Sequence, residues 1–255
     1  MWSLDPIGVL LPLVLSIAYA GLLAVRRTSW PAWRTVCWFA GVAVLAWSLL
    51  GAPAARRADT SWWGAAGIAL VAAVAPLGLA LGDPIGLWEK GRRPVAWIRR
   101  RVVRAVTFPL VASGASAALL TIAFTGGWYA SARRHDGPWT LLVLSALGVG
   151  LLVNLPLLSD DLLPTWCGPG MRTLLAFVDG LFDAIPGIVV MTTVERFTGG
   201  ALLSIAESVG IPMIFAVLLQ WVRSDERDAR EIDARLDASE AEGVHDGTPW
   251  WLKDA

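Results

Sequence analysis

Long stretches without a charged side chain set the tightest limit on how this chain folds. Each stretch reaches the roughly 20 residues that a helix needs to cross the hydrocarbon core of a bilayer. Five of them hold no Asp, Glu, Lys or Arg: 6–25, 36–55, 60–82, 105–132 and 137–159. Two more, 173–194 and 197–222, are long enough but contain Asp179, Asp183 and Glu207. The sequence therefore predicts seven membrane-spanning segments.

The overall composition agrees with a chain that lies mostly in lipid. Only 16% of its 255 residues are charged, whereas soluble domains carry about 25%. Inside a bilayer each backbone amide needs a partner within the protein, so only helices and closed barrels span it. The apolar stretches lack the alternation of a barrel strand. We therefore expect an all-α fold, a polytopic bundle of about seven transmembrane helices.

The distribution of basic residues predicts the orientation of this bundle. Lys and Arg are enriched in cytoplasmic loops of membrane proteins. With the N-terminus outside, 16 of the 21 basic residues fall in inner segments and five in outer loops. The opposite orientation would carry the basic cluster of 90–104 across the membrane. We predict an N-terminus outside, a C-terminus inside and a multi-pass membrane protein.

The chain divides into two regions by charge. Residues 1–222 form the predicted seven-helix transmembrane domain, and 223–255 form a charged cytoplasmic tail that is partly helical. Glu226 and Arg230, and likewise Glu231 and Arg235, have the i,i+4 order that supports a helix. The tail is interpreted either as a solvated helical end or as a docking site for a partner.

The loop before the fourth predicted span combines aromatic and apolar residues with a basic cluster. This composition is typical of a segment that lies on anionic lipid, where each basic residue contributes about 1 kcal/mol. The alternative is that the cluster serves only to fix the topology. The predicted lipid-binding residues are Lys90, Arg92, Arg93, Arg99, Arg100, Arg101 and Arg104.

Acidic residues within predicted spans are the main candidates for function, because ionisable groups are costly in lipid. Asp179 and Asp183 are four residues apart and share a helix face. Asp183 and Glu207 are expected at similar depth near the midplane, and Asp179 nearer Asn154 of the fifth span. The acids either bind a cation, relay protons, or hold helices together as neutral hydrogen-bonding groups. Asp183 and Glu207 are the candidate metal ligands, and the metal is left open.

Other function classes find no support in the chain. It contains no Walker A loop, no GxGxxG opening a helix, no HExxH and no GxSxG. We therefore expect no catalytic residues and no enzyme. The net charge is zero, which gives no reason to expect a nucleic-acid partner.

Several short motifs occur in an order that is similar to one membrane-protein family. They are Tyr19 to Arg27 followed by Trp33-Arg34, Ala75-Pro76 with Leu81-Gly82-Asp83-Pro84, Gly127-Trp128-Tyr129, Leu155 to Leu158 with Asp161, Pro164 and Arg172, Asp183 to Gly187, Gly199-Gly200, and Trp221 to Asp233. In order, spacing and topology they resemble the CtaG-type cytochrome c oxidase assembly factors of bacteria.

This resemblance implies a role in oxidase maturation, in which the family is implicated as a copper donor. The family typically carries His and Met in its third span, where this chain reads Ser61 to Leu70 without either, and a His where this chain has Asp183. Carboxylates suit harder cations than copper. We therefore transfer no copper ligand, leave the cofactor open between copper and none, and expect a multi-pass protein of the bacterial plasma membrane that assists maturation through contacts with oxidase subunits. The alternatives are a small ion or proton transporter using the acids, and a scaffold whose tail recruits a partner.

Overall fold

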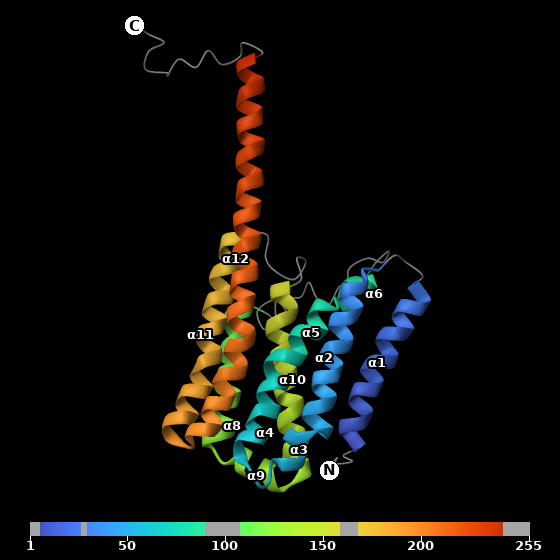
Figure 1. The fold of residues 1–255 in the computed structure, drawn as a ribbon, viewed down its shortest axis with the longest axis vertical. Helices are drawn as coiled ribbons and strands as arrows, with labels where there is room; N and C mark the ends of the chain where they lie inside the picture. The colour runs from blue at the N-terminus through green and yellow to red at the C-terminus, as the bar shows by residue number, and fades with distance from the viewer. Residues whose placement is uncertain (1–5, 27–29, 90–107, 159–167, 242–255) are drawn as a thin grey trace.

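The computed structural model describes residues 6–26, 30–89, 108–158 and 168–241, and these residues form a bundle of helices without a strand (Figure 1). The predicted all-α class is confirmed. The elements are α1 (Pro6–Arg26), α2 (Ala32–Leu50), α3 (Ala52–Arg56), α4 (Ser61–Ala69), the π-helix η1 (Leu70–Val74), α5 (Ala75–Leu81), α6 (Pro84–Glu89), α8 (Pro109–Thr125), α9 (Trp128–Arg134), α10 (Asp136–Leu158), α11 (Pro169–Thr193) and α12 (Arg196–Ala241).

Within the described residues, six spans are long and apolar enough to cross a membrane. A seventh is counted only if α8 and α9 are joined, and these two helices are bent by 67° at the break between them. The predicted stretch 105–132 is therefore not one straight helix. Gly126 and Gly127 separate the two, and Gly127 has a φ of 83°, which a residue with a side chain rarely adopts.

The third span changes its helical winding in the middle. Between α4 and α5, the five residues of η1 are wound as a π-helix, a feature that occurs often at functional sites. Gly150 of α10 packs directly on this turn, because a Cβ there would lie 2.1 Å from the Ala72 carbonyl oxygen. The two helices can approach this closely only because Gly150 has no side chain.

The helices fall into two neighbouring groups (Figure 1). On one side, α2 packs between α1 and α5, and Gly41 and Gly78 let α2 and α5 approach so closely that an added Cβ would meet backbone at less than 3 Å. On the other side, α8, α11 and α12 pack together. The helix α10 contacts α8, α5 and η1, and so joins the groups at the level of η1.

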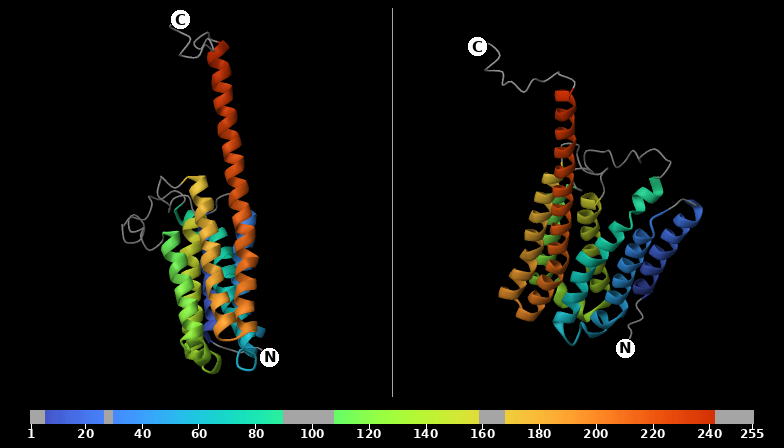
Figure 2. Two further views of the ribbon diagram at one scale, coloured as in Figure 1. Left: turned by 90° about the vertical axis from the view of Figure 1, so that its left-hand side faces the viewer. Right: turned by 45° about the horizontal axis from the view of Figure 1, so that its top comes forward.

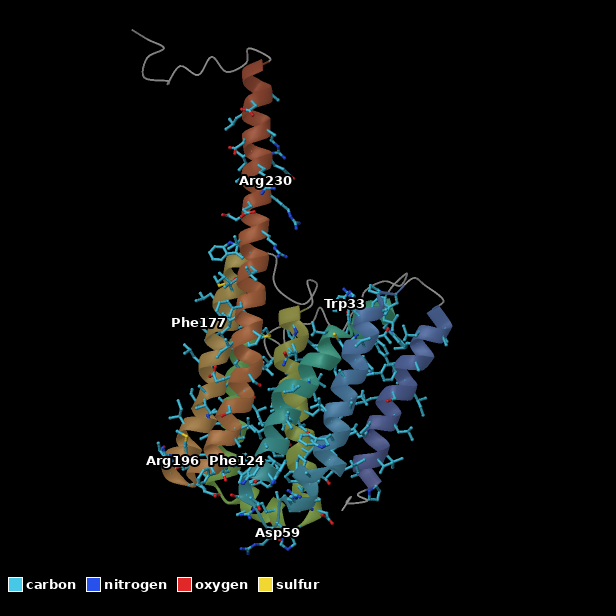
Figure 3. The ribbon with its side chains drawn as sticks, viewed as in Figure 1. Trp33, Asp59, Phe124, Phe177, Arg196 and Arg230 are labelled. Carbon is cyan, nitrogen blue, oxygen red and sulfur yellow. The ribbon has the colours of Figure 1, made fainter. Side chains whose placement is uncertain are left out.

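The outward surface of the bundle is apolar. Ile17 of α1, Ile122 of α8 and Phe177 of α11 are 62%, 65% and 52% exposed, and Figure 3 shows Phe177 pointing away from the helices. Exposure of such apolar side chains to water is unfavourable, whereas contact with the hydrocarbon of a bilayer is not. With the apolar spans, they establish a multi-pass membrane protein in contact with lipid.

The last helix is much longer than a bilayer requires. At 1.5 Å per residue, the 46 residues of α12 extend over roughly 69 Å. The C-terminal part of α12 extends beyond the other helices and stands alone, and the start of α1 and the end of α12 lie at opposite ends of the described bundle (Figures 1 and 2). Ion pairs join Glu226 to Arg230 at 3.4 Å and Glu231 to Arg235 at 3.5 Å. We call residues 223–241 the α12 extension.

Candidate functional site

The candidate site begins with two carboxyl groups on the inward face of α11. Asp183 lies ten residues from either end of the span Thr173–Thr193, which places it roughly 15 Å from both ends and near the midplane. Asp179 lies one turn away on the same face. The side chain of Asp179 is buried at 4% exposure, and that of Asp183 is half-buried. Both acids are therefore held at membrane depth inside the bundle.

Asp179 is bound by a hydroxyl group of α8. The Ser113 Oγ donates to Asp179 Oδ1 and also lies 2.8 Å from the Pro109 carbonyl oxygen. A hydroxyl has a single hydrogen to donate. With an ionised Asp179 carboxylate, the Ser113 hydrogen is shared between the two acceptors. With a protonated Asp179 carboxyl, Asp179 can donate to Ser113 while Ser113 donates to the Pro109 carbonyl oxygen. The arrangement accommodates Asp179 in either protonation state.

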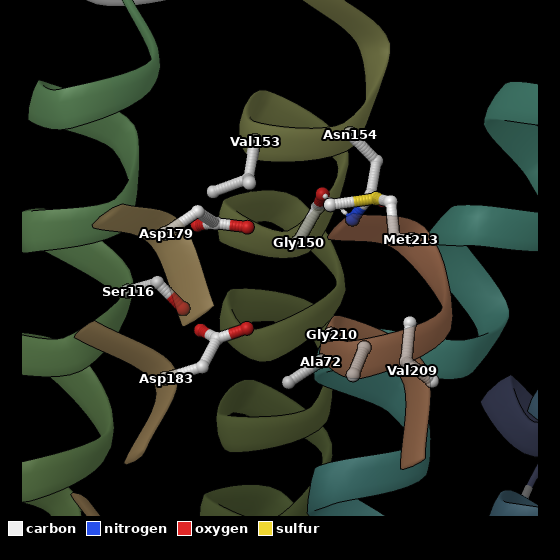
Figure 4. A pocket seen from close by; sticks show the side chains of 11 residues that line it. Ala72, Ser116, Gly150, Val153, Asn154, Asp179, Asp183, Val209, Gly210 and Met213 are labelled. Atoms are coloured by element: carbon white, nitrogen blue, oxygen red, sulfur yellow. Dashed lines mark hydrogen bonds between the residues drawn. The ribbon is translucent and has the colours of Figure 1, made fainter. Parts of the chain in front are cut away.

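A cavity of about 20 Å³ lies beside Asp179 (Figure 4). This volume holds one water molecule. The polar residues on its wall are Asp179 and Asp183 of α11, Ser116 of α8 and Asn154 of α10. The Asn154 amide donates to the Gly150 carbonyl oxygen at 2.9 Å. Four helices and η1 thus meet around a space of water size with oxygen and nitrogen atoms on its wall.

A second cavity of about 20 Å³ lies on the other side of Asp183. It shares Asp183 and Ser116 with the first cavity, together with Ala72 and Ala73 of η1. Pro186 of α11 closes part of its wall. Asp183 and Ser116 therefore stand between two spaces that each fit one water molecule.

The other predicted acid, Glu207 of α12, lies near the site but not in it. It is half-buried and interacts electrostatically with Asp183, as Asp179 does. It does not line either cavity. The structure thus brings Asp179, Asp183 and Asn154 to one cavity and leaves Glu207 outside it. The predicted lipid-binding cluster Lys90 to Arg104 lies outside the described residues.

Two site residues were missed by reasoning from the sequence. Ser116 follows Ser113 by one helical turn, on the same face of α8. Met213 of α12 lines the first cavity with Val209 and Gly210, which precede it by four and three residues and so share its helix face. That pattern could have placed Met213 toward the bundle, but not beside Asn154.

The donor atoms of this site do not match a copper centre. Cu(I) is bound by thiolate, thioether and imidazole groups, whereas the walls of the two cavities offer carboxyl, hydroxyl and amide groups with Met213 as their one sulfur among the described residues. No group of three His, Cys, Asp or Glu side chains in the described ranges is placed to hold a metal ion. The role of Asp183 and Glu207 as metal ligands stays a prediction.

A second polar cluster closes the end of the bundle opposite the α12 extension. Glu195, just before α12, accepts hydrogen bonds from Ser61 and Thr198, and Tyr129 donates to the Ser61 carbonyl oxygen. These bonds lower the pKa of Glu195 below its ordinary value, and Arg133 adds a smaller electrostatic contribution in the same direction. The cluster ties α4, α9 and α12 together.

Polar groups also fix the end of the bundle near the α12 extension. Tyr19 of α1 donates to the Gly82 carbonyl oxygen at 2.8 Å and accepts from the Trp30 indole at 3.1 Å. The Tyr19 ring stacks on Trp38 at 4.4 Å between centroids. Arg34 pairs with Asp83 just after α5. These contacts hold α1, α2 and the end of α5 in register.

A model of a known protein family matches most of the chain. A family model described as "Cytochrome c oxidase caa3 assembly factor (Caa3_CtaG)" matches residues 17–224. No curated protein and no solved structure matches the chain. Of the described helices, the matched region contains α2 to α11 in full, the second half of α1 and α12 as far as Ser224, and it includes the residues that line both cavities.

Proposed function

The chain belongs to the cytochrome c oxidase caa3 assembly factor family, and from this premise we propose that it assists the maturation of a membrane-bound cytochrome c oxidase without carrying copper itself. The match to residues 17–224 is the observation that carries this proposal. It covers more than half of the chain and ends at Ser224, before most of the α12 extension begins. We therefore expect the activity of such a protein in the bundle, not in the α12 extension.

The surface of α11 and α12 offers a way for such a protein to contact its target within the bilayer. Phe177 of α11 and Phe197 and Phe215 of α12 are exposed at 52%, 74% and 59%. Oxidase subunits are themselves embedded in lipid, so helix-to-helix packing is the contact available to them. Aromatic side chains supply large contact areas for that packing.

The copper-free part of the proposal rests on the chemistry of the donor atoms. One thioether beside oxygen donors does not supply the set of soft ligands that retains Cu(I). A variant in which the Met213 thioether is replaced, Met213→Leu, keeps the volume nearly constant. We expect this variant to support oxidase maturation as well as the wild-type chain does.

The experiment is deletion of the gene in its host, followed by measurement of oxidase activity and of the oxidase haem absorbance in isolated membranes. Succinate dehydrogenase activity serves as the control for a general respiratory defect. We expect oxidase activity to fall while the dehydrogenase is unchanged, and the wild-type chain and Met213→Leu to restore it equally. Normal oxidase in the deletion strain would refute the proposed function, and failure of Met213→Leu alone would refute its copper-free form.

A further inference from the structure

The two aspartates of α11 lie at membrane depth, and none of the residues that the structure describes gives them a basic partner. The side chains that line the two cavities include no Lys, Arg or His. The charged groups that interact with Asp183 are Asp179 and Glu207, both acidic. An ionised carboxylate in such a place is costly unless it is neutralised. The negative charge of the two carboxylates must therefore be neutralised by a bound proton or cation, because the side chains around them supply no positive charge.

The hydroxyl of Ser116 points to the place of the neutralising species, between the two carboxyl groups. Its side chain is only 4% exposed, and its oxygen forms no hydrogen bond with any residue that the structure describes. A Ser side chain in a helix ordinarily satisfies its hydroxyl locally, as Ser113 does toward Pro109. Ser116 instead faces the cavities, and Figure 4 shows its oxygen directed toward the space near both carboxyl groups.

The groups that face Asp183 from each neighbouring helix can be named. From α8 comes the Ser116 hydroxyl, and from α10 the Asn154 amide. The Ser113 hydroxyl of α8 is bonded to Asp179 instead. From α12 comes Glu207, and η1 contributes only apolar side chains. Asp183 itself forms no hydrogen bond with a described residue. A buried polar group without a protein partner is ordinarily satisfied by water, and the two cavities each have room for one molecule.

We propose that Asp179 and Asp183 form an intramembrane proton-binding site whose proton is exchanged through water in the two cavities. The transfer is balanced in atoms and charge: a water molecule takes the proton from the Asp183 carboxyl and gives one of its own to the Asp179 carboxylate. Ser116 can donate one hydrogen bond and accept others, and so orients the water between the two acids. The assignment is independent of the proposed role in oxidase maturation.

A proton is favoured over a metal ion by the size of the site and the number of its ligands. A hard cation such as Ca²⁺ requires six to eight oxygen ligands, and Mg²⁺ an octahedral set. The cavities are separate spaces of about 20 Å³ with few oxygen atoms on each wall. A single proton neutralises one carboxyl and requires no coordination shell.

The test uses the full chain reconstituted in lipid and infrared spectroscopy of the carbonyl stretch of a protonated carboxylic acid. At neutral pH we expect this band in the wild-type chain and in the control Asp225→Asn, which alters an exposed acid of the α12 extension. The double variant Asp179→Asn with Asp183→Asn loses the band completely. Ser116→Ala keeps the band and shifts its frequency, because one hydrogen-bonding neighbour is removed.

Two measurements on the wild-type chain need no variant of the site. Transfer to D₂O is expected to shift the band, which shows that the proton exchanges with water. Addition of Na⁺ or Ca²⁺ at constant pH is expected to leave the band unchanged. The proposal is overturned if the wild-type band is absent at neutral pH, if the folded double variant retains it, if D₂O does not shift it, or if an added metal ion displaces it.

Discussion

Replacement of Gly150 by Ala tests the contact between α10 and the π-helical turn that forms the wall of the candidate site. A Cβ at position 150 would lie 2.1 Å from the Ala72 carbonyl oxygen and 2.5 Å from Pro76 Cγ. The backbone oxygen cannot turn aside, so α10 must move away from η1. Overpacking of this kind costs about 1–3 kcal/mol.

A matched control is available two residues away on the same helix. A Cβ at Gly148 meets nothing within 4 Å. Gly-to-Ala replacement raises helix propensity by about 1 kcal/mol at an interior position, and this gain is common to both variants. The difference between Gly150→Ala and Gly148→Ala therefore isolates the clash, and we expect it to be about 1–3 kcal/mol in favour of Gly148→Ala.

The assay is reversible unfolding of the purified protein in mixed micelles of lipid and detergent, followed by circular dichroism as denaturing detergent is added. Gly150→Ala should unfold at a lower fraction of denaturing detergent than the wild-type chain, and Gly148→Ala at the same or a higher fraction. Equal stability of the two variants would refute the close packing of α10 on η1.

Three further predictions concern the ends of the bundle. Because the pKa of Glu195 is lowered in the folded state, the stability that its carboxylate contributes is complete above the ordinary Glu pKa of about 4.3 and is lost as the pH falls through the folded-state pKa. The difference in melting temperature between the wild-type chain and Glu195→Gln should therefore shrink on acidification. A constant difference would contradict the hydrogen-bonded carboxylate. Tyr19→Phe removes the bonds to Gly82 and Trp30 and should lower the free energy of unfolding by about 1–3 kcal/mol, since the Gly82 carbonyl oxygen loses the buried Tyr19 hydroxyl. An unchanged unfolding curve would count against that contact. A chain that ends at Ser224 should have the melting temperature of the full chain, because the described side chains of 225–238 are exposed. It should also restore oxidase activity in the deletion strain. Failure to restore it would show that the function depends on a partner bound by the α12 extension.

The sequence predicted those features of the fold that depend on local composition. Uncharged stretches identified the spans, because the cost of burying charge in lipid acts on each segment separately. The spacing of Glu226 and Arg230 predicted the helix that continues beyond the membrane. The bend at Gly127 was missed, because the apolar composition runs through it without interruption and only the positive φ reveals it.

The candidate site was predictable only in part. Asp179, Asp183 and Asn154 were selected because polar groups are rare in spans, and the depth of each follows from counting residues. Ser116 and Met213 could not be selected in that way, because hydroxyl and thioether groups are common in membrane helices and acquire meaning only from what packs opposite them. The position of η1 against Gly150, which sets the wall of the cavity, depends on a contact between residues 78 positions apart.

Copper loading of the purified chain decides between assistance through protein contacts and delivery of the metal. The wild-type protein, Asp183→Ala and Met213→Leu are incubated with Cu(I) under reducing conditions, freed of unbound metal and analysed for copper per chain. We expect all three to retain far less than one copper per chain, since the site offers one thioether among oxygen donors. Stoichiometric copper in the wild-type protein that is lost in either variant would contradict copper-free assistance and make this site a carrier of the metal.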